Sequence, residues 1–593
     1  MTAVIKEKKS RVKSDKPDVR PKGGWTPRRW AKEFRTAIPW NKEQLAVFDA
    51  AENTDDHLMI EAVAGAGKST VLKGLIGLFP NDTKINVLMF NKAVMVAFKE
   101  DPRVPKRVNV STAHGYCQGM LIGKFKGEMP KLEEGKSTRL ANYGLKKLKD
   151  AIRQIESRKD KKILPESREA SELILERWRD ELKKLIDFAR LNLVVPGEES
   201  LDFICGYFAI RFPFGKWGKS FAIDQATELL EVCFREGLYE KTIDYTDMLW
   251  LTYRLGLKPR PPAAKNAVLL VDELQDASPA MLSLYNKFKE AGYRLIGVGD
   301  RYQAITGAFA GARNDAMDKF AEMTDATCLP LAETQRCPKS HAALASLIVS
   351  DIRARQDAKA GSSKLMHSDT VRSVVTPGDL VICRFVSPLI KLFLQAKFFE
   401  GKEGIVRSRN VAAEMGRFAT TICGRYGDWS KFADRLAEQK EYQVGKLREG
   451  LQLTQADAWE DRFQCLEYCW EYLGKDSRSL EDFLERLKAA FPMETEDRTR
   501  HVIYSSIHSA KGDESHRVII VGANILPYQR QGMLKWMFVQ EVNATYVAIT
   551  RSKDELIFVP LDRTEEGVQI LLNQPLAGMQ MEYFPNIGDS DDF

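Results

Sequence analysis

A run of apolar residues that ends in acidic residues, at positions 268–276, constrains the fold of this chain more than any other feature. The run reads Val-Leu-Leu-Val-Asp-Glu-Leu-Gln-Asp. Four consecutive apolar residues predict a buried strand of a parallel sheet. Asp272 and Glu273 then stand at the C-terminal end of this strand, where open α/β sheets bind their ligands. The run therefore predicts an α/β fold with a ligand site at this edge of the sheet.

A second motif, at residues 62–69, predicts which ligand binds there. It reads Ala-Val-Ala-Gly-Ala-Gly-Lys-Ser and lies between a predicted strand at 58–62 and a predicted helix at 69–78. Glycines in such a loop allow backbone N–H groups to approach phosphates. We expect Lys68 to contact the β and γ phosphates and the Ser69 hydroxyl to bind Mg²⁺. Together with the acidic strand, this loop predicts a nucleoside triphosphatase.

The two adjacent carboxylates are expected to divide the chemistry between them. Asp272 would hold Mg²⁺, and Glu273 would orient or deprotonate the attacking water. Neighbouring side chains on a strand point to different faces, so an adjacent pair can take separate roles. The residues expected to surround the phosphates are Ala64, Gly65, Ala66, Gly67, Lys68, Ser69 and Thr70.

Composition limits the remaining classes of protein. The chain has 593 residues, of which 44% are hydrophobic and 29% charged, as is usual for globular proteins. At roughly 150 residues per domain, this length predicts three or four domains. The net charge of +7 permits a polyanionic partner without identifying one. No apolar run approaches the roughly 18 residues that span a bilayer, so we expect no membrane contact.

The nine cysteines are scattered along the chain, and no two have Cys-x-x-Cys spacing. This spacing argues against a structural zinc site. Free thiols are typical of a reducing compartment, which indicates a protein that works inside the cell.

The chain divides by composition and by hydrophobic periodicity into two α/β halves, each interrupted by a helical insertion. The N-terminal stretch mixes basic residues with prolines and cannot bury a core, so it is either a solvated arm or a nucleic-acid contact. The predicted division is a basic flexible tail at 1–36, a first α/β domain at 37–115 and 244–330 with a helical insertion at 116–243, a second α/β domain at 331–408 and 500–575 with a helical insertion at 409–499, and an acidic tail at 576–593.

Several short motifs occur in a set order and together resemble a known family. They are the segment that ends at Gln44, the acidic strand, Gly299-Asp-Arg-Tyr-Gln303, His508-Ser-Ala-Lys-Gly512 and Tyr546-Val-Ala-Ile-Thr-Arg551. The chain resembles superfamily 1 DNA helicases of the UvrD/Rep/PcrA type and their shorter phage and F-box relatives. The resemblance extends from Ile38 to about Val559. It implies two RecA-like P-loop domains with parallel sheets, each carrying a mostly helical insertion.

The resemblance also implies roles around ATP. Gln44 would read the adenine edge, and Gln303 would sense the γ-phosphate. Arg336 and Arg551, both from the second half of the chain, would act as arginine fingers, and Glu514 would contact the nucleotide sugar. Because a finger on a separate domain completes the site only when the cleft closes, ATP would close the cleft and hydrolysis would open it.

Contacts to DNA follow from the same resemblance. Phosphates would accept hydrogen bonds from polar side chains, and one aromatic side chain would stack on a base, a contact worth about 1–3 kcal/mol. Two alternatives stay open, namely that Lys92 is a solvated residue at a helix start and that Phe309 is a core aromatic. The candidate DNA-binding residues are Asn91, Lys92, Thr112, His114, Phe309, His508 and Ser509.

The function expected from these motifs is that of an ATP- and Mg²⁺-dependent DNA helicase or translocase. By resemblance it would move 3′→5′ on single-stranded DNA and unwind duplex DNA in replication, repair or recombination. The alternatives are a translocase that strips proteins from DNA without unwinding it, and a nucleotide-switched DNA-binding module.

We expect the partners to be single-stranded DNA and junctions of single- and double-stranded DNA, bound by a monomer. The acidic C-terminus, Gly588-Asp-Ser-Asp-Asp-Phe593, is similar to the tails of single-strand-binding proteins. It is either a docking segment for a replication or single-strand-binding partner or an ordinary solvated end. We expect a cytoplasmic protein in a bacterial or phage-infected cell, or a nuclear protein if the host is eukaryotic.

Overall fold

The structure is a computed structural model, and it describes residues 38–157, 168–262, 267–307, 311–407, 410–424, 428–491 and 500–561. The predicted basic tail at 1–36, the predicted acidic tail at 576–593 and the candidate residue Phe309 lie outside the described residues. The expectations for these three features therefore stay predictions.

The first sheet has six parallel strands in the order β3-β2-β6-β7-β1-β8. Its central strand β6 is buried at every position, as the apolar run predicts. We call the part of the chain built on this sheet the first lobe. The strands are β1 (Leu58–Ala62), β2 (Lys84–Met89), β3 (Asn109–Thr112), β6 (Ala267–Val271), β7 (Arg294–Gly299) and β8 (Thr327–Leu331).

The second sheet also has six parallel strands, in the order β11-β16-β15-β12-β14-β13, and carries the second lobe. The two parallel sheets confirm the predicted fold class of two α/β units with helical insertions. The strands are β11 (Ser362–Leu365), β12 (Leu380–Cys383), β13 (Gly404–Arg407), β14 (Val502–Ser506), β15 (Ser515–Val521) and β16 (Ser552–Val559).

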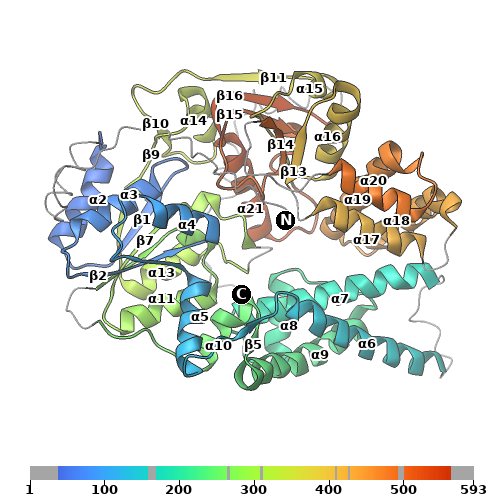
Figure 1. Cartoon of the computed structure of the whole chain (residues 1–593), viewed down its shortest axis with the longest axis horizontal. Helices are drawn as coiled ribbons and strands as arrows, with labels where there is room; N and C mark the ends of the chain where they lie inside the picture. Colours follow the sequence, from blue (N-terminus) through green and yellow to red (C-terminus); the bar gives the residue numbers. More distant parts are fainter. Residues whose placement is uncertain are drawn as a thin grey trace, which may run out of the picture.

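Helices cover both sheets (Figure 1). Those of the first lobe are α2 (Lys42–Asn53), α3 (Lys68–Leu78), α4 (Lys92–Glu100), α5 (Ala113–Lys124), α10 (Tyr245–Arg254), α11 (Pro279–Glu290) and α13 (Ala316–Thr324). Those of the second lobe are α14 (Lys339–Ala345), α15 (Ser368–Val374), α16 (Ser387–Glu400) and α21 (Lys535–Ile549). Shorter elements are η3 (Leu274–Asp276), η4 (Arg301–Gln303), η8 (Ala523–Ile525), and the paired strands β9 (Glu333–Thr334) and β10 (Arg353–Ala354).

The two helical insertions lie on the same side of the molecule, one below the other in the view of Figure 1. They touch, because the Thr421 hydroxyl of the second donates to Glu176 Oε1 of the first at 3.3 Å. The first contains α6 (Lys136–Ser157), α7 (Arg168–Leu191), α8 (Glu198–Tyr207), α9 (Gly215–Arg235) and η2 (Glu236–Glu240), and β4 (Lys131–Leu132) pairs with β5 (Thr242–Ile243). The second contains α17 (Val411–Cys423), η5 (Trp429–Lys431), α18 (Phe432–Glu449), α19 (Leu453–Cys469), η6 (Trp470–Gly474) and α20 (Leu480–Ala490).

One hydrophobic cluster crosses between the lobes. It joins Ile60 and Val298 of the first sheet to Ile520 of the second sheet and to Tyr546 of α21. Burial of apolar surface stabilises such a contact roughly in proportion to its area, at about 25 cal/mol per Å². The lobes are therefore held together by packing as well as by the polar contacts of the cleft.

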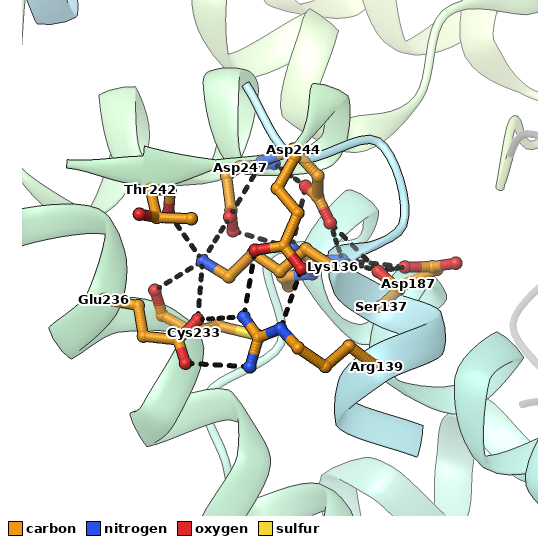
Figure 2. Close-up of polar contacts among 11 residues, drawn as sticks. Lys136, Ser137, Arg139, Asp187, Cys233, Glu236, Thr242, Asp244 and Asp247 are labelled. Atoms are coloured by element: carbon orange, nitrogen blue, oxygen red, sulfur yellow. Dashed lines mark hydrogen bonds and ion pairs between the residues drawn. The ribbon is translucent and has the colours of Figure 1, made fainter. Parts of the chain in front are cut away.

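A buried group of charged side chains ties the first insertion to the first lobe (Figure 2). Lys136 of α6 donates to Asp247 Oδ2 at 2.8 Å and to the Thr242 carbonyl at 2.9 Å. Arg190 of α7 donates to Asp247 Oδ1 at 2.6 Å and to Asp244 Oδ1 at 3.0 Å. Both cations are fully buried and paired, which is the condition under which buried charges are tolerated.

The same carboxylates begin α10. Asp244 accepts a hydrogen bond from the backbone N–H of Asp247, and Asp247 accepts one from the backbone N–H of Asp244. Tyr245, the first residue of α10, makes an edge-to-face ring contact with His114, and the two ring centroids lie 6.4 Å apart. The charged group therefore positions one of the candidate DNA-binding residues.

Candidate active site

A cavity of about 1010 Å³ lies between the lobes, at the C-terminal ends of β1 and β6. The first lobe lines it with the phosphate loop and with the acidic residues that follow β6. The second lobe lines it with residues from four separate segments, at 334–338, 355–359, 508–516 and 551–554. The predicted site residues in this lining are Gly65, Ala66, Gly67, Lys68, Ser69, Thr70, Asn91, Asp272, Glu273, Gln303, Arg336, His508, Glu514 and Arg551.

The phosphate loop needs its glycines for two reasons. Gly65 and Gly67 have φ angles of +73° and +85°, in the left-handed region that favours glycine. A Cβ atom at Gly65 would also lie 2.6 Å from the Arg336 Cβ atom, so a side chain there would collide with the second lobe. The loop is therefore packed directly against Thr334 and Arg336 of the second lobe at this point.

The second lobe also binds the phosphate loop through polar contacts. The backbone N–H of Ala64 donates to the Tyr546 hydroxyl at 2.8 Å, and the backbone N–H of Gln335 donates to the Gly65 carbonyl at 2.8 Å. Tyr546 is fully buried on α21. A movement of α21 would therefore be transmitted directly to the backbone of this loop.

The general-base candidate Glu273 pairs with the loop lysine. Lys68 Nζ lies 3.3 Å from Glu273 Oε2. Burial raises the pKa of Glu273, but Lys68 and Lys511 outweigh it and bring the pKa to about 2. Glu273 also has φ of +52°, an uncommon backbone conformation for a residue with a side chain. The carboxylate is therefore ionised at neutral pH and held in a strained position.

The neighbouring carboxyl group has the opposite shift. Burial and the charge of Glu273 raise the pKa of Asp272 to about 7. Among the described residues, the buried Oδ1 atom of Asp272 has no hydrogen-bond partner. A buried carboxylate oxygen without a partner, on a residue of the cavity that Ser69 also lines, fits Mg²⁺, which prefers oxygen ligands. Ser69 and Asp272 are thus the residues that would hold the ion.

The raised pKa of Asp272 predicts that Mg²⁺ binding strengthens with pH. Only the ionised carboxylate binds the cation, and this form becomes dominant as pH rises through about 7. We expect a titration with Mg²⁺ in the presence of nucleotide to show about tenfold tighter binding per pH unit below pH 7, and a plateau above it.

Two variants distinguish the titration of Asp272 from that of Asp300. Burial raises the pKa of Asp300 to about 6. The pH dependence should persist in Asp300→Asn and disappear, together with most Mg²⁺ affinity, in Asp272→Asn. Equal pH dependence in the parent and in Asp272→Asn would contradict this prediction.

Gln275, which follows the acidic pair, connects Glu273 to the residues after β7. Gln275 Nε2 donates to Glu273 Oε2, and Gln275 Oε1 accepts from the backbone N–H of Asp300 at 2.9 Å. Asp300 Oδ2 in turn accepts from Gln303 Nε2 at 2.7 Å. These contacts form a continuous chain from Glu273 to Gln303.

The second-lobe residue Lys511 reaches across the cleft to two first-lobe groups. Its Nζ atom donates to Asp276 Oδ2 at 2.5 Å and to the Gln303 carbonyl at 2.6 Å. Thr306 donates to the other oxygen of Asp276 at 2.8 Å. Sequence reasoning assigned no role to Asp276 or Lys511, because 235 positions separate them along the chain.

The two candidate arginine fingers lie at different depths. Arg551 is buried, with 1% of its surface exposed, and its Nη2 atom lies 3.4 Å from Gln303 Oε1. Burial and the nearby Arg336 lower the pKa of Arg551 to about 10, so it stays charged at neutral pH. Arg336 donates from Nε to Glu514 Oε2 at 2.7 Å. The Glu514 carboxylate, predicted to contact the sugar, therefore holds the Arg336 guanidinium here.

The adenine-reading candidate Gln44 is partly engaged within the protein. Its Oε1 atom accepts from the backbone N–H of Asn41 at 3.2 Å and completes the cap of α2. Its Nε2 atom donates to the Ala66 carbonyl at 3.1 Å. Each amide atom keeps one further hydrogen-bonding position, so the side chain can still meet a base beside the phosphate loop.

Two of the candidate DNA-binding residues begin helices. The Asn91 side chain accepts from the backbone N–H of Val94 and caps α4, and the Thr112 hydroxyl accepts from the backbone N–H of Gly115 and caps α5. Capping uses an acceptor on each side chain and leaves the Asn91 amide N–H and the Thr112 O–H as donors. A phosphate is an acceptor, so capping is compatible with the predicted contacts.

The remaining candidates lie in different surroundings. Lys92 and Ser509 are exposed, and Ser509 shares a 3.0 Å hydrogen bond with Ser506. His114 is half-buried beside Tyr245, and burial lowers its pKa. His508 lines the cleft, and burial, Arg384 and Lys511 lower its pKa to about 3, so it is neutral at physiological pH.

Two parallel sheets, a phosphate loop, an acidic strand end and arginines from a second lobe define a two-lobed phosphate-loop enzyme. Residues 40–325 match the model of the UvrD/REP helicase N-terminal domain, and residues 408–562 match that of the UvrD-like helicase C-terminal domain. A search among curated proteins finds no match. The chain belongs to the UvrD-type superfamily 1 helicases, and it is an ATP-dependent DNA helicase.

General properties of the family therefore apply to this chain. UvrD-like helicases use ATP, generally with Mg²⁺, and they bind DNA. Across the described residues, no helix has the length and apolar character needed to cross a membrane. The predicted domain boundaries and the roles of individual site residues stay predictions.

Proposed function

We propose that this helicase moves 3′→5′ along single-stranded DNA and separates duplex DNA ahead of it, as a monomer. The observation that supports this proposal best is the contact of Arg551 and Lys511, from the second lobe, with Gln303 of the first lobe. The same cavity holds Lys68 and Glu273. A site shared in this way responds to the distance between the lobes, which is what a stepping motor requires.

The proposed chemistry divides among named side chains. The loop backbone and Lys68 bind the phosphates. Ser69 and Asp272 would hold Mg²⁺, which would neutralise charge on the phosphate oxygens. Glu273, ionised and strained in the present structure, orients the water and takes its proton. Arg551 and Arg336 stabilise charge that develops on the transferred phosphoryl group, and Gln303 senses the γ-phosphate.

Hydrolysis is proposed to move DNA through the same contacts. Loss of the γ-phosphate removes the partner of Arg551 and Gln303, so the attraction between the lobes weakens and the cleft opens. Candidate DNA-binding residues stand on both lobes, with Thr112 on the first and Ser509 on the second. Opening and closing of the cleft would therefore change the distance between the DNA contacts of the two lobes, and this change would move the protein one step along the strand.

The direction is tested with duplexes that carry a single-stranded tail at either the 3′ or the 5′ end. We expect ATP-dependent unwinding of the 3′-tailed duplex only. Unwinding of the 5′-tailed duplex alone would contradict the proposed direction. Displacement of bound protein without strand separation would favour a stripping translocase, and absence of DNA-stimulated phosphate release would favour a nucleotide-switched binding module.

The cellular role is proposed from the class of enzyme. A 3′→5′ helicase acts on junctions in replication, repair or recombination. The acidic C-terminal residues are proposed to dock on a replication or single-strand-binding partner. Removal of residues 588–593 should leave ATP turnover unchanged and weaken that docking, and unchanged binding to such partners would contradict this part of the proposal.

A further inference from the structure

A second polar cavity, of about 550 Å³, lies in the first lobe beside α5, on the flank of the sheet formed by β2 and β3. In Figure 1, α5 runs away from the sheet next to α10. Ser111, the residue before the candidate DNA contact Thr112, lines one end of this cavity, and Lys258 and Arg260 also line it. We call this feature the α5 groove.

The α5 groove is open because one flank of the helix carries no side chains. Gly115, Gly119 and Gly123 recur every fourth residue and therefore share one flank of α5. A Cβ atom at Gly119 or Gly123 would meet nothing within 4 Å. Glycine is a poor helix former, so three glycines on one flank weaken α5 unless the open space serves a purpose.

The charge of the α5 groove is entirely positive. Its lining includes Lys84, Lys124, Lys258 and Arg260 and contains no aspartate or glutamate. One of these cations, Lys258, already has a partner, because its Nζ atom lies 3.2 Å from Glu290 Oε2. Lys84 Nζ lies over the Tyr293 ring, 5.6 Å from its centroid, and a neutral ring does not cancel its charge. The groove therefore keeps a net positive charge that attracts an anionic ligand.

A buried donor at the base of the α5 groove also lacks a partner. Asn86 on β2 is 1% exposed, and its Oδ1 atom accepts from Asn109 Nδ2 at 2.8 Å. Among the described residues, nothing accepts a hydrogen bond from its Nδ2 atom. Buried donors are almost always paired, so an unpaired amide on a residue that lines the groove favours an acceptor bound there.

We propose that the α5 groove binds the phosphodiester backbone of single-stranded DNA beyond the contacts made by Thr112 and His114. This inference rests on the proposed function, in which Thr112 is the DNA contact of the first lobe. A helix of this length spans about 18 Å, long enough for several consecutive phosphates. The one ring in the lining, that of Tyr116, packs against Phe288, and the positive charges and the amide donor suit a backbone contact that is independent of sequence.

An acidic protein segment would satisfy the same charges, but continuity favours DNA. Ser111 belongs to both the α5 groove and the strand end that carries Thr112. Thr112 is therefore next in sequence to a residue of the groove, which favours a single strand that contacts both. The test must nevertheless distinguish the two kinds of anion.

The test measures how affinity grows with DNA length. Fluorescent oligothymidylates from about 8 to about 30 nucleotides are titrated against the full chain. We expect Lys124→Glu/Arg260→Glu to bind the shortest oligomers like the parent and the longest about tenfold more weakly. The slope of log affinity against log salt should fall by about 1.4, since each single-strand phosphate contact contributes about 0.7.

A second variant fills the α5 groove without changing charge. Gly119→Leu/Gly123→Leu replaces two poor helix formers where there is open space, so α5 should be at least as stable. This variant should bind short oligomers like the parent and should lose as much affinity for long oligomers as the charge variant does. Matched controls are Lys99→Glu/Lys106→Glu, which changes the same charge elsewhere on the first lobe, and Gly206→Leu, which fills open space on α8. Both controls should bind like the parent.

The outcomes separate this inference from the function on which it rests. Parent-like affinity of both groove variants at every length would overturn the inference while leaving the helicase proposal intact. Competition by polyglutamate, with no loss for long DNA, would assign the α5 groove to an acidic protein and would overturn it as well. Failure of the parent to bind any oligomer would instead contradict the proposed function.

Discussion

Replacement of Arg551 by alanine is expected to lower DNA-stimulated ATP turnover by about 10³-fold or more, with little change in ATP binding. The guanidinium reaches Gln303 from the second lobe and is the deepest positive charge which that lobe brings to the cleft. Its attraction for the phosphoryl group grows as charge develops during hydrolysis, so its loss slows the chemical step. Steady-state turnover with saturating single-stranded DNA, beside titration of a fluorescent nucleotide, measures both quantities.

Controls for Arg551 address folding, because the side chain also donates to backbone carbonyls of Val547 and Asp513. Arg551→Lys keeps the charge and should recover only part of the rate, since an ammonium group lacks the fork geometry. Arg517→Ala removes a second-lobe ion pair with Asp379 that lies outside the cleft, and it should turn over ATP like the parent. If Arg551→Ala turned over ATP like the parent, Arg551 would not be part of the active site.

Replacement of Lys68 by alanine should abolish measurable ATP hydrolysis and leave DNA binding in the absence of nucleotide largely intact. Lys68 begins α3, lines the cavity and pairs with Glu273, so it provides positive charge where the phosphates are expected. Its removal also raises the pKa of Glu273, because Lys68 is the main group that lowers it. A phosphate-release assay and a DNA titration on the same preparation test both parts.

The matched control for this variant is Lys73→Ala on the same helix. Lys73 Nζ pairs with Asp101 at 2.7 Å, outside the cavity, so its loss affects the same helix without touching the phosphate site. We expect turnover close to that of the parent. If Lys68→Ala hydrolysed ATP at a rate similar to Lys73→Ala, the phosphate loop would not be the site of catalysis.

The sequence was most informative where local pattern and chemistry coincide. The strand predicted at 58–62 is found with the same bounds, and the run before Asp272 forms the fully buried strand β6. Continuous apolar residues followed by glycines or carboxylates leave few alternative structures. The loop residues and the acidic pair therefore gather in one cavity, as their order in the chain predicted.

Contacts between distant segments could not be predicted in the same way. The hydrogen bond from Ala64 to Tyr546 joins residues that are 482 positions apart, and no local pattern encodes such a pairing. Strand β11 was also not singled out, because most of its residues are polar and at least partly exposed. An edge strand of this kind takes its stability from pairing with β16, a contact that depends on the assembled fold.

The candidate DNA contacts show a further limit of sequence patterns. Asn91 and Thr112 were selected for hydrogen bonds to phosphates, and each also caps a helix. Short polar side chains before a helix serve both purposes, so the residue type alone does not separate them. Capping uses the acceptor oxygen of the side chain, whereas a phosphate contact uses its N–H or O–H donor.

The proposed mechanism depends on a catalytic site that both lobes complete, and a double-mutant cycle between Arg551 and Gln303 tests this most directly. Turnover is measured for Arg551→Ala, Gln303→Ala and the double variant under saturating ATP and single-stranded DNA. Groups that act as one unit lose their effect together, so the double variant should be about as slow as the slower single variant. Losses that multiply across the two lobes would show that the residues act independently, and would contradict a shared site.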